Sequence, residues 1–232
     1  MLDFAAIYQY LPDFTQSLWL TIKLTFISSI VGLILAIPLS LMGLSKHRLI
    51  RYPVDAFSYF FRGTPLLIQI YLLYFGASQF SIIRDTPWLW DILKHAYWCA
   101  LIVFALNTAA YTIEILKGAI KNTPKGEIEA ATACGMSQYL LMRRIVLPSA
   151  FRRALPAYNN EIIFMLHGTA QASAITLIDL TGMARRMYAR TFLPFEAFLT
   201  AACFYLVLTF LLVGLFKYLE KRYLSYLNIP KI

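Results

Sequence analysis

Five apolar segments dominate this sequence, and each is long enough to cross a lipid bilayer. They lie at about 18–44, 57–80, 96–116, 156–178 and 197–217. A membrane-spanning helix needs about 20 mostly apolar residues. An open sheet would leave its edge groups unpaired in lipid, and the roughly ten-residue alternation of a closed barrel is missing. The sequence therefore predicts an all-α membrane protein with five transmembrane helices, forming one domain over residues 1–232.

The overall composition supports this fold class. Hydrophobic residues make up 59% of the 232 residues and charged residues 14%, whereas soluble domains are about half apolar and a quarter charged. The net charge of +9 would suggest nucleic acid in a soluble protein. Here the basic residues flank the apolar segments, so we expect a bilayer and no nucleic-acid partner. Asp3 and Asp13, without any Lys or Arg before residue 16, do not fit a signal peptide, so we expect the first segment to be retained.

The distribution of Lys and Arg predicts the orientation in the membrane. Fourteen of them lie in segments 45–56, 117–155 and 217–232, and five lie in segments 81–95 and 179–196. Cytoplasmic loops carry the excess of positive charge. We therefore expect a multi-pass protein of the bacterial inner membrane with the N-terminus periplasmic and the C-terminus cytoplasmic. Three arginines in segment 179–196 oppose this bias: Arg185, Arg186 and Arg190.

Two of the five segments are unusually polar for membrane spans. The second contains FRGTP at 61–65, in which Gly63 and Pro65 weaken a helix and Arg62 is costly in lipid. The fourth contains Asn159, Asn160, Glu161, His167, Thr169 and Gln171. Broken helices with polar groups near the middle of the membrane are typical of transporters. We therefore expect these segments to line a cavity.

A polar loop at 123–148 separates the third and fourth segments. Thr123 is expected to cap a short helix with Pro124 at its first position, and Gly135 suits the left-handed turn that ends it. Ser137 is expected to begin a second short helix that runs to Arg144 and stops at Pro148. The physical pattern leaves two interpretations open: an amphipathic loop lying on the lipid surface, or a handle for another protein.

The spacing within this loop resembles the EAA signature of membrane subunits of ABC importers. All seven fixed positions match: Glu129, Ala130, Ala131, Gly135, Ile145, Leu147 and Pro148. In that family two short helices dock into a groove on the ATPase subunit and transmit its motion to the membrane helices. The resemblance implies that residues 123–148 form a cytoplasmic coupling loop, with Glu129 on the docking helix and Gly135 at the bend.

Other segments extend the resemblance over nearly the whole chain. Three segments resemble the polar-amino-acid branch of these ABC permeases: FRGTPLLIQ (61–69), AYTIEILKGAI (110–120) and ALPAYNNEIIFMLHGTA (154–170). More narrowly, the chain is similar to M-type membrane subunits of histidine/lysine/arginine/ornithine importers. RRMYARTFLPFEAF (185–198) occupies the position of the extracytoplasmic gate. The chain departs from the family at Gly168-Thr169-Ala170-Gln171, where the resemblance implies a serine and then, after the alanine, a leucine.

The resemblance implies a type I ABC importer transmembrane domain of the MetI-like fold, working by alternating access. It implies two ATPase subunits, a second and paralogous membrane subunit, a periplasmic substrate-binding protein and a basic amino acid as substrate. The chain has no GxxxxGK[ST] motif, so we expect ATP and Mg to be bound by the partner ATPase and no cofactor by this chain. Its scattered Cys and His residues do not resemble a metal site.

Four residues are candidates for substrate binding. Glu161 is expected to attract the cationic side chain of the substrate, because an ionised carboxylate in a dry bundle is costly without a partner. An internal ion pair with Arg62 is the alternative. Asn160 and Arg62 are candidates for the substrate's carboxylate, and Thr64 is a further candidate.

We expect more ordinary roles for two other polar residues. His167 is expected to be a hydrogen-bonded core histidine. It lies seven residues after Asn160, close to the same helical face, so a place along the translocation path is the alternative. Glu114 is expected to pair with a nearby Lys or Arg.

Two other classes of function compete with the importer hypothesis. The first is an autonomous secondary transporter or channel for amino acids, which would usually show repeated halves. The second is a membrane-embedded enzyme, which would need clustered nucleophiles or metal ligands. Neither pattern is found in the sequence.

Overall fold

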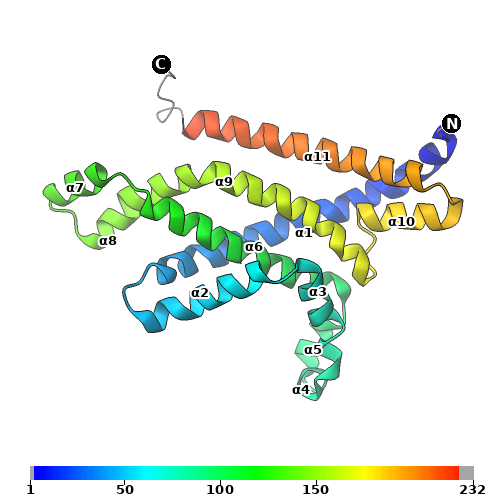
Figure 1. The fold of residues 1–232 in the computed structure, drawn as a ribbon, viewed down its shortest axis with the longest axis horizontal. Coiled ribbons are helices and arrows are strands. Elements are labelled where there is room, and N and C mark those ends of the chain that lie inside the picture. Colours follow the sequence, from blue (N-terminus) through cyan, green and yellow to red (C-terminus); the bar gives the residue numbers. More distant parts are fainter. Residues whose placement is uncertain (1–2, 225–232) are drawn as a thin grey trace.

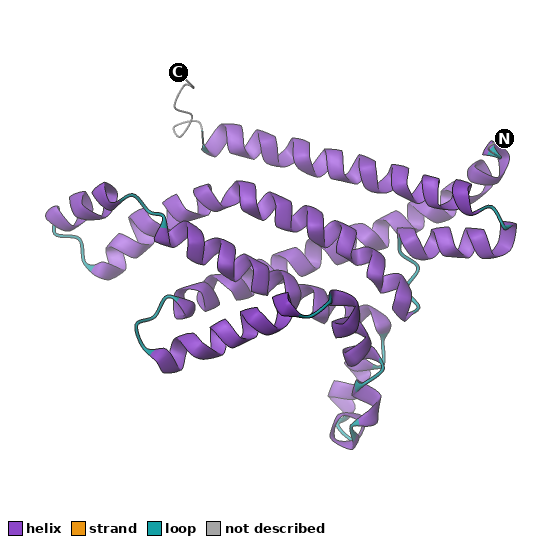
Figure 2. Ribbon diagram, viewed as in Figure 1, coloured by secondary structure: helices purple, strands orange, loops and turns teal. Residues whose placement is uncertain are grey.

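The computed structural model describes residues 3–224 as an elongated bundle of helices (Figure 1). Every regular element in this range is helical (Figure 2), as predicted. Residues 225–232, part of the predicted cytoplasmic segment, lie outside the described residues. The elements are α1 (Phe4–Gly43), α2 (Arg48–Gly63), α3 (Leu66–Tyr74), η1 (Ala77–Gln79), α4 (Ser81–Arg84), α5 (Pro87–Leu93), α6 (Ala96–Lys121), α7 (Lys125–Ala133), α8 (Gln138–Leu141), η2 (Met142–Val146), α9 (Leu147–Gly168), η3 (Thr169–Ile175), α10 (Leu180–Thr191) and α11 (Pro194–Tyr223).

All five predicted apolar segments are helical, but they differ in how they would cross a membrane. Among the described residues, α1, α6 and α11 are each long and apolar enough to span it alone. The run Gln138–Ile175 joins α10 at an angle of 47°, and this bent pair makes a fourth candidate span. The second predicted span, 57–80, is not one helix, because it breaks between α2 and α3.

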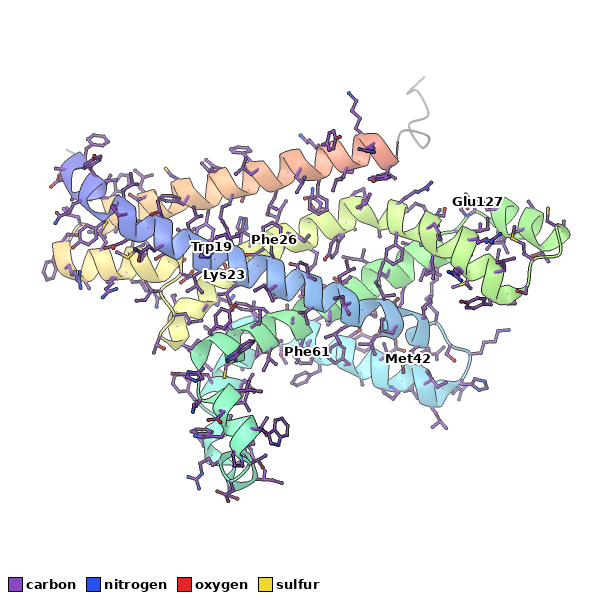
Figure 3. All side chains as sticks on the ribbon, turned by 180° about the vertical axis from the view of Figure 1, so that it is seen from behind. Trp19, Lys23, Phe26, Met42, Phe61 and Glu127 are labelled. Carbon is purple, nitrogen blue, oxygen red and sulfur yellow. The ribbon has the colours of Figure 1, made fainter. Side chains whose placement is uncertain are left out.

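The first helix is much longer than the predicted span. Its 40 residues extend over about 60 Å, twice the roughly 30 Å of hydrocarbon in a bilayer. Trp19 and Lys23 lie together on its outer face (Figure 3), with the Lys23 Nζ atom 5.3 Å from the centre of the Trp19 ring. This pairing is typical of a membrane–water boundary. The N-terminal turns of α1 therefore extend beyond the apolar layer and pack on α10 and α11 through Phe14.

The most extensive contact in the bundle is between α1 and α6. Small side chains recur every four residues on α1, at Ser28, Gly32, Ala36 and Ser40, and all four are buried. A Cβ atom added to Gly32 would lie 3.0 Å from the carbonyl oxygen of Ala105 and 3.1 Å from the backbone nitrogen of Ala109. In lipid, helices associate through such close backbone approach and not through the hydrophobic effect. α6 in turn packs on α2, α3 and α9, so this pair is the centre of the fold.

The break between α2 and α3 is closed by two buried amides. Gln69 donates from Nε2 to the carbonyl oxygens of Phe61 (2.8 Å) and Thr64 (3.0 Å) and to Thr64 Oγ1 (2.7 Å). Asn107 of α6 donates from Nδ2 to the same Phe61 carbonyl (3.0 Å) and to Gln69 Oε1 (3.2 Å). A broken helix is tolerated at membrane depth only where its freed backbone groups find partners. Gly63 and Pro65 thus mark the break, and Gln69 and Asn107 hold it.

We expect Gly32→Ala to lower the free energy of unfolding by about 1–3 kcal/mol, because the added methyl group meets backbone atoms of α6. Gly214→Ala is the matched control. Its added Cβ meets no atom within 4 Å, and alanine favours a helix by about 1 kcal/mol over glycine. Thermal unfolding of both variants in mild detergent tests the expectation. Equal melting temperatures for the two variants would contradict close packing at Gly32.

We expect Gln69→Met to destabilise the protein by about 1–3 kcal/mol, because the variant keeps the side-chain volume and leaves the freed carbonyls unpaired. Gln79→Met, at an exposed position of η1, is the control. Thermal unfolding checks the stability. Proteolysis near residue 64 of the folded protein checks whether the break has loosened, and wild-type resistance in Gln69→Met would argue against the bracing role.

Candidate functional site

A cavity of about 670 Å³ opens beside the break in the second span. Its walls come from the break itself, from α6 and from the C-terminal half of α9 with the start of η3. The volume lies in the range typical of small-molecule sites, about 300–1,000 Å³. The residues that line it are Arg62, Gly63, Thr64, Pro65, Leu66, Asn107, Tyr111, Glu161, Phe164, Met165, His167, Gly168 and Gln171. Three of the four predicted substrate-binding residues, Arg62, Thr64 and Glu161, are among them.

Glu161 is held in the cavity wall by α6. Its side chain is 6% exposed, and its Oε1 accepts a 2.8 Å hydrogen bond from Thr108 Oγ1. The methyl group of Thr108 lies over Gly32, where a Cβ would approach it to 2.3 Å. The glycine on α1 therefore leaves the space in which Thr108 turns its hydroxyl group toward Glu161. The alternative of an Arg62–Glu161 ion pair is not found in the described part of the chain.

Arg62 lies at the end of α2, immediately before the break. Its guanidinium carbon lies 5.6 Å from the centre of the Tyr111 ring, an arrangement that attracts the cation without neutralising it. Within the described residues no carboxylate lies within 4.0 Å of its nitrogen atoms. The cavity therefore presents one positive and one negative group, on different walls, and each is free to meet a charge of opposite sign.

Two polar residues of α9 lie elsewhere than the preferred interpretation placed them. Asn160 is exposed and is not among the residues that line this cavity, because a step of one residue turns a helix by about 100° away from Glu161. Its assignment to the substrate's carboxylate stays a prediction. His167, for which a place along the path is the alternative to the core, has an exposed side chain that lines the cavity, and its Nε2 lies 3.2 Å from Thr209 Oγ1. It lies almost two turns beyond Glu161, toward the same opening.

The sequence reasoning missed three polar residues of this region. Asn107 and Thr108 sit in the apolar third segment, and Gln69 follows the FRGTP break. All three are buried and hydrogen-bonded to the site. The available signal was the presence of polar side chains within membrane segments, which are rare unless they have partners.

The expected pairing of Glu114 is confirmed, since Lys117 Nζ lies 2.9 Å from Glu114 Oε1 and 2.8 Å from Asp55 Oδ1.

The polar loop forms two short helices joined at a glycine, as predicted. α7 ends at Ala133, and Gly135 has a φ of +74°, which favours glycine. Ser137 begins α8, where its hydroxyl group accepts from the Leu140 backbone nitrogen at 3.4 Å. The loop lies at one end of the molecule, where Glu127 marks it in Figure 3. Ala131, Leu141 and Val146 form a small core that makes the loop one packed unit.

Both predicted ends of this loop need correction. Thr123 does not cap α7, since Pro124 holds the cap position and the Thr123 hydroxyl group donates to the Ile120 carbonyl at 2.8 Å. Pro148 does not stop the second helix but stands in the first turn of α9. The preceding π-helical turn η2, in which the Leu147 nitrogen donates to the Met142 carbonyl, accommodates the proline. The loop is therefore continuous with α9.

The seven motif positions differ in their exposure to solvent. Glu129, Ala130, Gly135 and Pro148 are exposed, whereas Ala131 is buried and Ile145 and Leu147 are partly buried. A groove of about 420 Å³ runs between α7 and the start of α9. It is lined by Glu127, Ala130, Ala131, Cys134, Met136, Arg144, Ile145, Pro148, Ser149 and Arg152. The buried positions hold the loop together, and the exposed ones, among them the small residues Ala130 and Gly135, leave a surface on which another protein can pack closely.

Comparisons with known proteins agree with this architecture. Residues 28–225 match the family described as binding-protein-dependent transport system inner membrane component. The octopine transport system permease protein OccM of Rhizobium meliloti is 46% identical over 201 residues, which cover 87% of this chain and 82% of that protein. The histidine/lysine/arginine/ornithine transport system permease protein HisM of Escherichia coli (strain K12) is 43% identical over 209 residues, covering 90% and 88%.

Solved structures show the same fold. An amino acid ABC transporter solved with histidines matches with a TM-score of 0.85 at 32% identity, over 96% of this chain and 99% of that chain. An inward-facing methionine ABC transporter, MetNI, matches with a TM-score of 0.74 at 18% identity, which shows the fold alone. The chain belongs to the binding-protein-dependent transport system inner membrane components, and it is a permease subunit of an ABC importer of the amino-acid type, in which separate subunits hydrolyse ATP.

Proposed function

We propose that this permease subunit imports basic amino acids of the histidine/lysine/arginine/ornithine type. The observation that carries the proposal is the cavity in which Glu161 and Arg62 face the same space without pairing. A zwitterion with a cationic side chain satisfies both groups. Glu161 meets the side-chain cation, and Arg62 meets the carboxylate. The names of HisM and OccM, similar over most of the chain, refer to histidine, lysine, arginine, ornithine and octopine, all of which carry a basic group.

The break in the second span supports the assignment of Arg62 to the substrate's carboxylate. The first turn of α3 begins at Leu66 and lines the cavity together with Arg62 and Thr64. The N-terminus of a half-helix carries partial positive charge and favours anionic substrate groups in transporters. Thr64 uses its hydroxyl group within the break, donating to the Phe60 carbonyl at 2.8 Å and accepting from Gln69. We therefore assign Thr64 to shaping this end of the site rather than to the main charge interaction.

The mechanism we propose is alternating access driven by a pair of ATPase subunits. ATP and Mg bind to those subunits, and the loop at 123–148 carries their motion to the membrane helices. The assembly further includes a second, paralogous membrane subunit and a periplasmic substrate-binding protein, with the N-terminus of this chain periplasmic and its C-terminus cytoplasmic. Coupling requires the substrate to bind the outward and inward states differently. We assign that difference to Glu161, whose position in the cavity wall depends on α6 through the hydrogen bond from Thr108.

We expect Glu161→Gln to reduce arginine or lysine uptake by at least about tenfold, since losing a close charge pair in a desolvated site costs 2 kcal/mol or more. The measurement is uptake into proteoliposomes that hold the assembled importer, with the same loaded binding protein throughout. Glu220→Gln, half-buried in α11 and outside the cavity, is the control. Unchanged uptake at normal expression would refute the role of Glu161 in selecting cations.

We expect Glu129→Lys, combined with Gly135→Pro, to abolish retention of the ATPase subunit. The first change reverses an exposed charge on α7, and the second cannot adopt the φ of +74° at the elbow. Co-purification in mild detergent followed by mass spectrometry measures what remains bound. Asp85→Lys, an equal charge change at an exposed position near α4, is the control. An ATPase bound to neither the native chain nor the double variant would favour a lipid-surface loop and an autonomous transporter.

A further inference from the structure

Arg153, in the second turn of α9, lies beside the connection between α6 and the coupling loop. This connection, residues 122–124, is short: α6 ends at Lys121 and α7 begins at Lys125. A connection of three residues is a natural hinge, because a few residues at the ends of elements absorb the backbone changes of a moving part. If it bent freely, motion of α7 would be lost there instead of reaching α6.

The side chain of Arg153 holds both sides of this hinge. Its Nη2 donates to the Ala119 carbonyl oxygen at 3.2 Å and to Thr123 Oγ1 at 2.8 Å. Ala119 belongs to the last turn of α6, whose final carbonyl groups have no partner within the helix. A cation at this end is also favoured by the helix dipole. Thr123 is 6% exposed, and its hydroxyl group donates in turn to the Ile120 carbonyl. The hydrogen bonds of Arg153 therefore extend to a second carbonyl group at the end of α6.

The same guanidinium group reaches α7 through one intermediate residue. Nη1 of Arg153 donates to Ser149 Oγ, and Ser149 Oγ donates to Glu127 Oε2 at 3.2 Å. The donor directions are consistent, because the serine hydroxyl group accepts from the arginine and gives its own proton to the carboxylate. Arg153 on α9 is therefore hydrogen-bonded to the end of α6 and, through Ser149, to the first turn of α7.

The rest of the loop has a firm connection to α9 but not to α6. α7 packs on α8 and η2 through the core of Ala131, Leu141 and Val146, and η2 continues into α9 without interruption. The contribution of α6 to that core is Ile120, which is only partly buried. α6 carries Thr108 and Asn107, which hold Glu161 and the broken span. Thr108 lies eleven residues before Ala119, about 17 Å along the helix.

We propose that Arg153 is the positioning residue that joins motion of the coupling loop to α6, so that the two cavity walls formed by α6 and α9 move as one unit. This proposal rests on the proposed function, in which an ATPase moves the loop. Arg153 lies outside the seven EAA positions and outside the predicted coupling loop. Its role is mechanical and differs from docking: the side chain holds the angle between the loop and the bundle.

The test uses the complete importer in proteoliposomes and compares Arg153→Ala with Arg153→Lys. Three quantities are measured: ATPase retained per membrane subunit, ATP hydrolysis stimulated by the loaded binding protein, and substrate molecules imported per ATP hydrolysed. Arg48→Ala is the control, since Arg48 is exposed, lies outside the loop at 123–148, and its side chain forms no hydrogen bond or ion pair with the described residues. It removes the same charge without changing the loop.

We expect Arg153→Ala to retain the ATPase and hydrolyse ATP while import per ATP falls by about tenfold, a size typical of coupling free energies. Arg153→Lys should recover part of the ratio, because an ammonium group can bond fewer of these acceptors at once. Thr123→Val should lower the ratio as well. Combined with Arg153→Ala it should add little, because the two changes remove one interaction.

Three outcomes would overturn the proposal. An import-to-ATP ratio in Arg153→Ala equal to that of Arg48→Ala would show that the hinge does not need the hydrogen bonds of Arg153. Loss of the bound ATPase in Arg153→Ala and Thr123→Val would show that the residue serves docking or folding of the loop instead. A native chain that retains no ATPase would refute the proposed function itself, and this proposal with it.

Discussion

The close approach of α1 and α6 is the interaction on which the rest of the structure depends. Gly32 allows the two backbones to meet, and the space it leaves is filled by Thr108 of α6. Because Thr108 then donates to Glu161, the helix pair also fixes the acidic wall of the cavity. One residue earlier, Asn107 holds the broken span that carries Arg62. Packing between helices in lipid thus sets the positions of both charged groups in the site.

Arg62 and Glu161 line the same cavity but do not form an ion pair among the described residues. An ionised group within a membrane protein is costly, and an internal ion pair would lower that cost. Glu161 instead has a neutral donor, and Arg62 has an aromatic face. Both partners stabilise the ion and leave its charge available. Such incomplete compensation makes this arrangement less stable than an internal ion pair, and the proposed zwitterionic substrate would recover the difference.

Local signals in the sequence predicted much of this structure, and tertiary contacts explain what they missed. Gly135, Ser137 and the break at Gly63–Pro65 were predictable because backbone conformation there depends on the residue itself. Thr123 and Pro148 were misassigned for the opposite reason. The Thr123 hydroxyl group is engaged by Arg153 from another helix, and Pro148 follows a π-helical turn that has no simple sequence signature.

The same distinction applies to the polar loop at 123–148. Its motif identifies the residues that form the surface and the elbow, but it does not show how the loop is attached to the bundle. That attachment has two parts, a continuous helix into α9 and the hydrogen bonds of Arg153 to the end of α6. A loop attached at α9 alone would move one wall of the cavity. Attachment at both helices moves the wall that carries Glu161 together with the helix that orients it, so the hydrogen bond from Thr108 to Glu161 is kept during the motion.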